Sequence, residues 1–178
     1  LHPILHSFPT RRSSDLSANV CTLYESKRRK AESFSSRRLL VMKQCNVNKF
    51  NMIGVQESRS LLTRVVVVND FFVVSSAASP KGYYGCELWI SCHLKVGGVR
   101  PSIDGITLIH ADPQRLLVSI QISTFLMYAY VLHAPQCEAK SAEDKSFKMS
   151  SSERRSWWRK TTEDCKDLDS VVPLFLFC

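Results

Sequence analysis

The sequence lacks the short motifs that identify several common classes of protein. Its seven cysteines include no Cys-x-x-Cys pair and no spacing of Cys with His that forms a zinc site, so reduced and mostly buried thiols are expected. It contains no Gly-x-Ser-x-Gly turn that would present a nucleophilic serine. The first residues do not have the basic, apolar and small-residue order of a signal peptide, which favours an intracellular protein, nuclear or cytoplasmic.

What is present is the composition of one globular domain with a local excess of positive charge. Of the 178 residues, 44% are hydrophobic and 22% are charged, and the formal net charge is +8. Residues 17–59 hold nine Lys or Arg against three Asp or Glu, whereas residues 60–178 are nearly balanced. The excess centres on residues 27–30 and on Arg37 and Arg38, which suit a phosphate-bearing partner or, alternatively, a solvated helix face.

The first sixteen residues are treated separately from the rest. Phe8–Leu16 resembles the translation of a common sequencing adapter, so we expect residues 1–16 to be a non-native, disordered segment. The genuine domain is then expected over residues 17–178. The chain begins at Leu1 and stops on an apolar run at Cys178, and both ends are expected to be cut.

Hydrophobic periodicity and turn residues predict a mixed α/β order of elements. One helix is expected within residues 25–45, and a second begins at Ser150, which has capping-box spacing with Glu153, and ends near residue 165. The expected strands are the apolar or alternating runs 52–56, 65–68, 71–74, 86–92, 118–123, 125–132 and 171–177, the last of them buried.

The long apolar run 116–134 requires a separate test, because it is long enough to suggest a membrane span. Val118, Ile120 and Ile122 alternate with polar residues, which is the period of a half-buried strand. The run therefore predicts two paired strands, and no membrane partner is expected.

Three polar residues stand near the ends of predicted apolar segments: Asn19, Glu57 and His133. Ligands of α/β sheets gather outside the carboxyl ends of strands, and a carboxylate there suits a hard cation such as magnesium. Each residue also has an ordinary interpretation, because Glu57 fits a solvated acid, His133 a core histidine and Asn19 a turn residue or helix cap.

Taken together, these residues carry a resemblance. The segments Ala18-Asn19-Val20, Gln56-Glu57-Ser58-Arg59 and Leu132-His133-Ala134-Pro135 occur in this order, and the chain resembles the endonuclease/exonuclease/phosphatase superfamily. It is most similar to the retroelement-type endonucleases, with the His-x-Pro variant of the deoxyribonuclease-like branch. The resemblance implies a four-layer α/β/β/α sandwich that cleaves phosphodiester bonds, here of DNA, with a divalent metal.

The resemblance also implies a role for each residue of the candidate site. Glu57 would bind Mg²⁺ or Mn²⁺, and His133 would assist the leaving oxygen. Asn19 would support the metal or the phosphate, Gln56 would pack beside the metal ligand, and Arg59 would face the substrate. Such a set is chemically coherent, because a hard cation polarises the phosphoryl group and a positioned general acid contributes roughly 10²- to 10⁴-fold.

The sequence also departs from the family pattern. The pattern requires an Asp-x-Asn element after a strand such as 171–177, and later an Asp-His pair that activates the attacking water, and the sequence has neither. We therefore expect a partial domain that lacks the general base. Two alternatives remain open: a noncatalytic nucleic-acid-binding or interaction remnant of the same fold, and a phosphatase acting on a lipid or inositol headgroup. Trp157 and Trp158 are expected to pack in the interior and not to stack on bases.

Overall fold

The computed structural model describes residues 15–19, 36–135 and 150–178. Its elements, in chain order, are β1 (Asp15–Asn19), α1 (Ser36–Val47), β2 (Met52–Gln56), β3 (Arg64–Val68), β4 (Phe71–Ser75), β5 (Cys86–Ser91), the 3-10 helix η1 (Ile103–Gly105), β6 (Ile106–Asp112), β7 (Arg115–Ile122), β8 (Phe125–Leu132), α2 (Ser151–Asp164) and β9 (Leu174–Phe177). The predicted mixed α/β class is confirmed.

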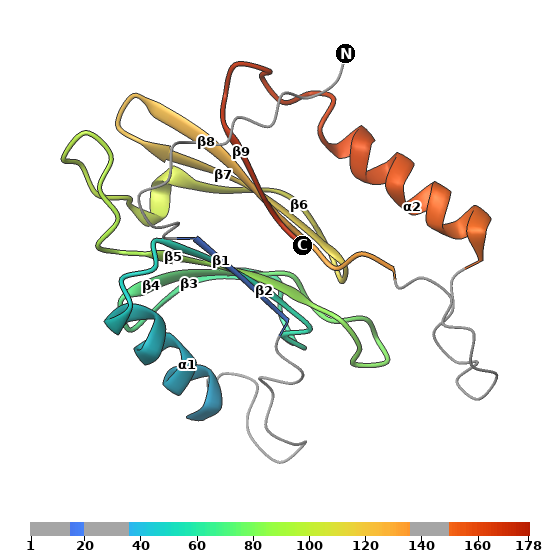
Figure 1. Cartoon of the computed structure of the whole chain (residues 1–178), viewed down its shortest axis with the longest axis horizontal. Coiled ribbons are helices and arrows are strands. Elements are labelled where there is room, and N and C mark those ends of the chain that lie inside the picture. Colours follow the sequence, from blue (N-terminus) through green and yellow to red (C-terminus); the bar gives the residue numbers. More distant parts are fainter. Residues whose placement is uncertain (1–14, 20–35, 136–149) are drawn as a thin grey trace.

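The strands form two sheets, which Figure 1 shows lying against each other. The first sheet has the order β1-β2-β5-β4-β3 and the second the order β6-β7-β8-β9. Most neighbours are antiparallel, but β1 runs parallel to β2 and β9 parallel to β8. Both parallel strands are therefore edge strands of their sheets.

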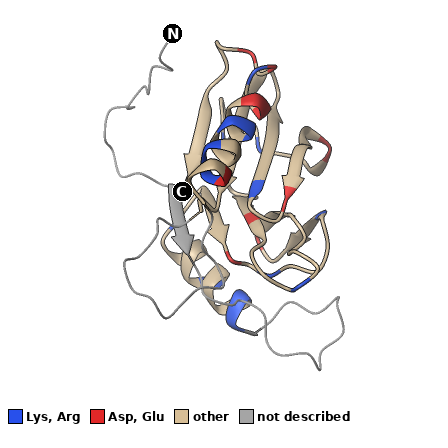
Figure 2. Ribbon diagram, turned by 90° about the vertical axis from the view of Figure 1, so that its right-hand side faces the viewer, with Lys and Arg blue, Asp and Glu red and all other residues tan. Residues whose placement is uncertain are grey.

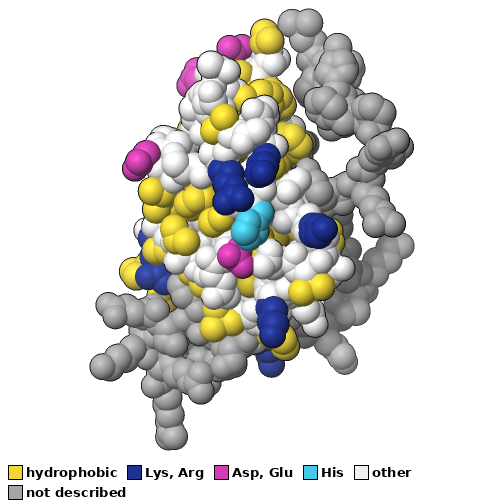
Figure 3. Space-filling view, turned by 90° about the vertical axis from the view of Figure 1, so that its left-hand side faces the viewer, with side chains coloured by type: hydrophobic (Ala, Val, Ile, Leu, Met, Phe, Trp, Pro, Cys, Tyr) yellow, Lys and Arg dark blue, Asp and Glu magenta, His cyan; other side chains and the backbone are white. Residues whose placement is uncertain are grey.

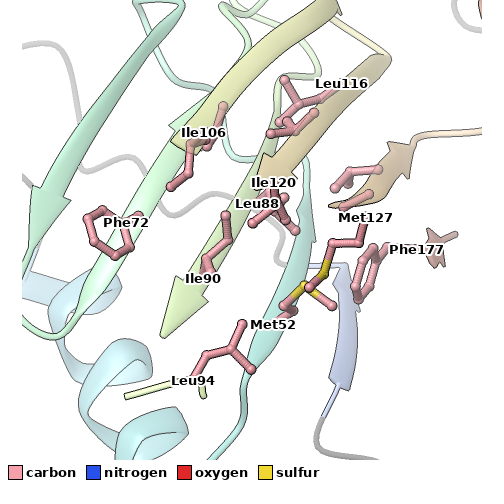
Figure 4. Packing of buried hydrophobic residues seen from close by; sticks show 14 of the residues in the cluster. Met52, Phe72, Leu88, Ile90, Leu94, Ile106, Leu116, Ile120, Met127 and Phe177 are labelled. Carbon is pink, nitrogen blue, oxygen red and sulfur yellow. The ribbon is translucent and has the colours of Figure 1, made fainter. Parts of the chain in front are cut away.

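Three hydrophobic clusters separate four layers. The largest lies between the two sheets, and Figure 4 shows side chains such as Leu88 of β5 and Ile120 of β7 meeting there. A second cluster joins the outer face of the first sheet to α1 through Met42 and Trp89. A third joins the outer face of the second sheet to α2, where Trp157 is the buried residue of the helix. The observed order is helix, sheet, sheet, helix.

Several local predictions hold for identifiable reasons. All five residues of β2 are buried because the strand is covered on both faces, and its sequence is accordingly apolar except at the last residue. Asn69 and Asp70 form the turn between β3 and β4, and Asn69 has the positive φ of 51° that such tight turns require. The capping box at the start of α2 is present, with Ser150 and Glu153 each bonded to the other's backbone N–H.

Two strand predictions need correction. β6 was not predicted, because its sequence mixes polar and apolar residues, and the structure places it at an edge with several half-exposed side chains. The run 171–177 was predicted to be a buried strand, which is wrong. Only Leu174–Phe177 forms β9, and Phe177 is its one buried residue because the strand lies at the opposite edge of the sheet. Val171 lies in the turn before the strand and is 87% exposed.

Other expectations fall partly outside the described residues. Asp15 and Leu16 are paired with Met52 and Ile53 in β1, so the boundary expected before Ser17 falls inside a strand. Residues 1–14 and 20–35, which include most of the predicted adapter segment and the basic run at 27–30, lie outside the described part of the chain.

The cysteines and helices provide two further observations. The described cysteines are all free. Cys45 and Cys86 are buried, Cys178 is exposed and the other two are intermediate, so the expectation of mostly buried thiols was too general.

Of the helices in the described residues, none has the length and apolar character needed to cross a membrane.

The contact between β2 and β9 yields a test of the sheet packing. A Cβ atom added at Gly54 would overlap the Cβ and Cγ atoms of Phe177, so Gly54→Ala must displace β9 from the first sheet. We expect a loss of about 1–3 kcal/mol of unfolding free energy, measured by urea denaturation. In a Phe177→Gly background the same change should cost clearly less. Equal costs in the two backgrounds would contradict this packing.

Candidate functional site

One edge of the molecule brings together the ends of strands from both sheets. Gln56 ends β2 in the first sheet, and Leu132 ends β8 in the second. The Gln56 side chain is buried, and its Nε2 donates a hydrogen bond of 2.9 Å to the backbone oxygen of Leu132. This polar contact therefore ties the two sheets together immediately before Glu57 and His133, the residues that follow these strands.

Glu57 and His133 form a pair across this edge. Glu57 Oε1 lies 3.5 Å from His133 Nε2, and the two side chains are 24% and 10% exposed. Glu57 has a φ of 54°, an uncommon left-handed conformation for a residue with a side chain, so the chain turns directly after β2. The carboxylate is therefore partly open to solvent while the imidazole beside it is nearly enclosed.

The surroundings of His133 keep its ring largely out of water. The Tyr84 ring packs edge-on against it with a centroid distance of 5.2 Å, and the His133 backbone N–H donates to Gln114 at 2.8 Å. Among the described residues, the buried Nδ1 has no hydrogen-bond partner. Burial lowers the pKa of His133 below its ordinary value, although the charge of Glu57 acts in the opposite direction. Burial therefore favours the neutral form of the ring.

The segment after Glu57 is fixed by its backbone. Ser58 N–H donates to Gly85 at 3.0 Å and Arg59 N–H donates to Tyr84 at 2.9 Å. Gly85 has a φ of 92°, and a Cβ there would lie only 3.0 Å from the Arg59 nitrogen, so a side chain at this position would be strained and crowded. Arg59 Nε is buried without a hydrogen-bond partner among the described residues.

Asn19 is placed by the backbone register alone. It is the last residue of β1, and it pairs with Gln56 in the parallel β1–β2 ladder. Parallel strands end at the same edge, so β1 leads to the edge that carries Glu57. The side chain of Asn19 is outside what the structure describes, and its role remains a prediction.

Tyr84 is the site residue that the sequence did not reveal. It lies in the loop between β4 and β5 with a φ of 66°, and no pattern distinguishes it from its neighbour Tyr83. Its contact with His133 depends on a hydrogen bond between Gly85 N–H and Pro113 O, at 2.7 Å, which links loops from the two sheets. Such a long-range contact leaves no local sequence signal.

Arg38 is unavailable to a phosphate, which corrects the expectation for the Arg37 and Arg38 pair. Its Nη2 lies 2.8 Å from Glu87 Oε1, and both side chains are buried between α1 and the first sheet. Trp89 Nε1 donates to the other oxygen of Glu87 at 2.8 Å. Burial raises the pKa of Glu87, and the Arg38 charge opposes that rise. Since a buried charge that loses its partner is costly, this pair holds α1 in place.

Two other histidines of the described residues lie beside aspartates: His93 at the opposite ends of the strands, and His110 near the β6–β7 turn, which adjoins this edge because Arg115 pairs with Leu132. His93 Nε2 lies 3.5 Å from Asp70 Oδ1, at the opposite ends of the strands. Both side chains are about half exposed, and in the view of Figure 3 a histidine lies beside an acidic side chain and among Lys and Arg side chains.

The second pair is His110 with Asp112, whose atoms Nε2 and Oδ2 are 3.2 Å apart. Arg115 Nε also bonds Asp112, at 2.7 Å, and Arg115 Nη1 bonds Asp164 of α2 at 2.7 Å. The backbone N–H of Gln114 and the Arg115 guanidinium together outweigh burial and lower the pKa of Asp112. This cluster fastens α2 to the outer face of the second sheet.

The described residues contain no group of three or more His, Cys, Asp and Glu side chains that would enclose a metal ion. The site thus offers Glu57 as a partly exposed carboxylate. Because Mg²⁺ keeps several waters and is often held by one or two carboxylates plus substrate phosphates, such a donor set fits a weakly held hard cation and does not fit a closed structural metal site.

Comparisons with known proteins add no evidence about the function of this site. No protein family matches the chain, and no curated protein does. The relation to the endonuclease/exonuclease/phosphatase superfamily thus rests on the quoted segments and remains a proposal.

The Glu57–His133 contact has a measurable consequence. Because the Glu57 charge favours imidazolium, Glu57→Gln should lower the pKa of His133 further, as measured by an NMR pH titration of the ring signals. Asp70→Asn is the matched control, since Asp70 faces His93, and it should leave His133 unchanged. A His133 titration that is the same in Glu57→Gln and in the parent chain would exclude the contact.

Proposed function

We propose that this chain carries part of a metal-dependent phosphodiester hydrolase domain of the endonuclease/exonuclease/phosphatase type, acting on DNA. The observation that supports this most is the Glu57–His133 pair, a partly exposed carboxylate beside an enclosed imidazole. The helix, sheet, sheet, helix order agrees with the architecture that the family would require. Retroelement-type endonucleases are the branch that the quoted segments resemble.

In this proposal Glu57 holds a divalent cation, Mg²⁺ or Mn²⁺, at the mouth of the site. When bound, the cation neutralises charge that develops on the phosphoryl oxygens. The side chain is open enough for this role, whereas Glu87 is fully buried and already paired with Arg38. The positive φ of Glu57 directs the chain away from the sheet directly after β2, so the carboxylate lies beyond the buried strand.

His133 would act on the leaving oxygen. Its lowered pKa favours the neutral ring, and a neutral ring still has one N–H to donate. A phosphate that binds near Glu57 would face Nε2, and the approach of its negative charge would favour the protonated ring. A bound phosphate would thus raise the pKa of His133 and favour the form that donates a proton to the leaving oxygen.

Three further residues support the pair in this proposal. Gln56 is a positioning residue, because its bond to Leu132 fixes the chain immediately before both functional side chains. Arg59, in the turn after Glu57, would face the substrate phosphate. Asn19 would face the same edge from β1, next to Gln56.

We further propose that the described residues do not supply the general base. The His93–Asp70 pair lies at the far ends of the strands, and the His110–Asp112 pair is engaged with Arg115. The first pair is therefore distant from His133, and the Asp112 carboxylate of the second, although near this edge, is committed to Arg115.

Cation binding tests the role of Glu57 without requiring turnover. On titration with Mn²⁺, paramagnetic broadening should reach the ring signals of His133 before those of His93, and Glu57→Gln should abolish the selective broadening at His133. Asp70→Asn is the matched control, because it also removes one carboxylate charge beside a histidine. It should leave the broadening of the His133 signals intact. Equal broadening of both histidines, unaffected by Glu57→Gln, would refute a cation site at Glu57.

Plasmid nicking tests the reaction and the missing base separately. We expect this chain to give no measurable nicking of supercoiled DNA with Mg²⁺ or Mn²⁺, since loss of a positioned base costs about 10²- to 10⁴-fold. Nicking that is abolished by Glu57→Gln and by His133→Ala would support the reaction and overturn the absence of a base. Nicking that both variants retain would point to a contaminant or a different site.

A noncatalytic nucleic-acid-binding role is the second candidate, favoured by the lack of a multidentate metal group in the described residues. Under this alternative, DNA binding would be independent of Mg²⁺ and unaffected by Glu57→Gln. A phosphatase of lipid or inositol headgroups would instead release phosphate from inositol phosphates in a reaction that depends on Glu57. Measuring both substrates with the same protein separates these alternatives.

A further inference from the structure

Helix α2 has an inward face that fixes its rotation on the second sheet. Trp157 is only 7% exposed and belongs to the cluster with Leu117, Tyr130 and Leu132. At the end of the helix, Asp164 is bonded to Arg115 at 2.7 Å. These contacts determine which residues of α2 point away from the protein.

Trp158 is on the outward side, contrary to the expectation that both tryptophans pack in the interior. It is 49% exposed, and its ring meets that of Trp157 edge to face, with a centroid distance of 4.8 Å and an interplanar angle of 89°. Because Trp157 is itself held in the core, this contact restrains the Trp158 ring while leaving much of it in water. The result is a restrained aromatic surface on the outside of the helix.

Basic residues surround this surface. Arg155 and Arg159 are exposed and lie one turn apart, three residues before and one residue after Trp158, with Arg154 and Lys160 beside them. In Figure 2 the basic residues give α2 two blue bands. In the described part of the chain neither Arg155 nor Arg159 has an ion pair or a side-chain hydrogen bond.

The acids of α2 do not neutralise these arginines. Glu153 is occupied by the capping box and Asp164 by Arg115, and the exposed Glu163, four residues after Arg159, forms no ion pair with it in the described part of the chain. Like charges spaced by four residues, as in Arg155 and Arg159, destabilise a helix by a few tenths of a kcal/mol in isolation, which an anionic ligand would relieve. Its charge is complementary to a polyanion.

We propose that Trp158, Arg155 and Arg159 form a binding surface for single-stranded nucleic acid. An unpaired base would stack on the indole of Trp158, and the arginines would contact the phosphates on either side. Stacking requires an unpaired base, which favours a single strand over a duplex. A lipid surface fits less well, because an interfacial helix needs a broad exposed apolar face and Trp158 is the one large hydrophobic residue that α2 exposes.

The position of this surface relates it to the candidate site without depending on its chemistry. Trp157 packs on Leu132, the residue before His133, and Figure 1 shows α2 extending beyond the ends of the sheets on that side. A strand bound along α2 would therefore run toward the edge that holds Glu57 and His133. Binding itself requires neither the metal nor cleavage, so it can be tested separately.

The test is a titration of the chain with a 15-nucleotide oligothymidine in EDTA, followed by tryptophan fluorescence and by anisotropy of a labelled oligonucleotide. Stacking should quench the Trp158 emission. Trp158→Ala should weaken binding by at least about fivefold, and Trp158→Phe, which retains an aromatic face, should stay within about twofold of the parent chain. Trp158→Ala loses the ring contact with Trp157 and should lower the urea midpoint, whereas Trp158→Phe retains an aromatic ring there; far-UV circular dichroism should show both variants folded under the binding conditions, which separates binding from folding.

The arginines have a matched control. The logarithm of the association constant falls as the logarithm of the salt concentration rises, with a slope of about −0.7 for each phosphate contact to a single strand. Arg155→Gln and Arg159→Gln should each make this slope shallower by about 0.7. Arg100→Gln removes an exposed arginine from the loop after β5, at the opposite ends of the strands, and should leave the slope unchanged. Binding that survives Trp158→Ala, or that Arg100→Gln weakens as much as Arg155→Gln, would overturn the proposal. Tighter binding to a duplex or to phosphatidylserine vesicles, with Trp158 quenched or blue-shifted there instead, would also overturn it.

Discussion

The architecture depends on the burial of both faces of each sheet. The inner faces pack against each other, and the outer faces are covered by α1 and α2, so almost every side chain of β2 and β5 is enclosed. In such a layer an unpaired polar group costs about 1–3 kcal/mol. Two polar side chains inside these layers are paired accordingly: Arg38 with Glu87 under α1, and Gln56 with the carbonyl of Leu132 between the sheets.

This constraint also explains why the candidate site lies at an edge. Where the strands end, burial ends with them, and the chain can turn through left-handed residues such as Glu57 and Arg59. Strained backbone of this kind persists when its surroundings determine it, and here the bonds from Ser58 and Arg59 to the β4–β5 loop do so. The buried hydrogen bond from Gln56 to Leu132 joins the two sheets at this edge. It thereby fixes the distance between the backbone positions of Glu57 and His133.

Local patterns predicted most of the fold, and they failed where a residue's environment is set by distant contacts. The turn at Asn69 and the cap at Ser150 follow from short-range chemistry and were predictable. Burial of Arg38 depends on a glutamate far along the chain, and the opposite exposures of Trp157 and Trp158 depend on which side of α2 meets the second sheet. The pairing of Glu57 with His133 was anticipated through resemblance, since no local pattern joins residues on different sheets.

The parallel pairing of the two edge strands has a consequence for the order of folding. The antiparallel pairs β3–β4, β6–β7 and β7–β8 are joined by tight turns, whereas β1 must find β2 and β9 must find β8 across long stretches of chain. Closing a longer loop costs more entropy, and contacts between distant residues form more slowly. The hairpins are thus expected to form early and the parallel edges late. Since β2 and β8 carry the candidate residues and adjoin these late strands, the edge is completed near the end of folding, after the hydrophobic layers have already collapsed.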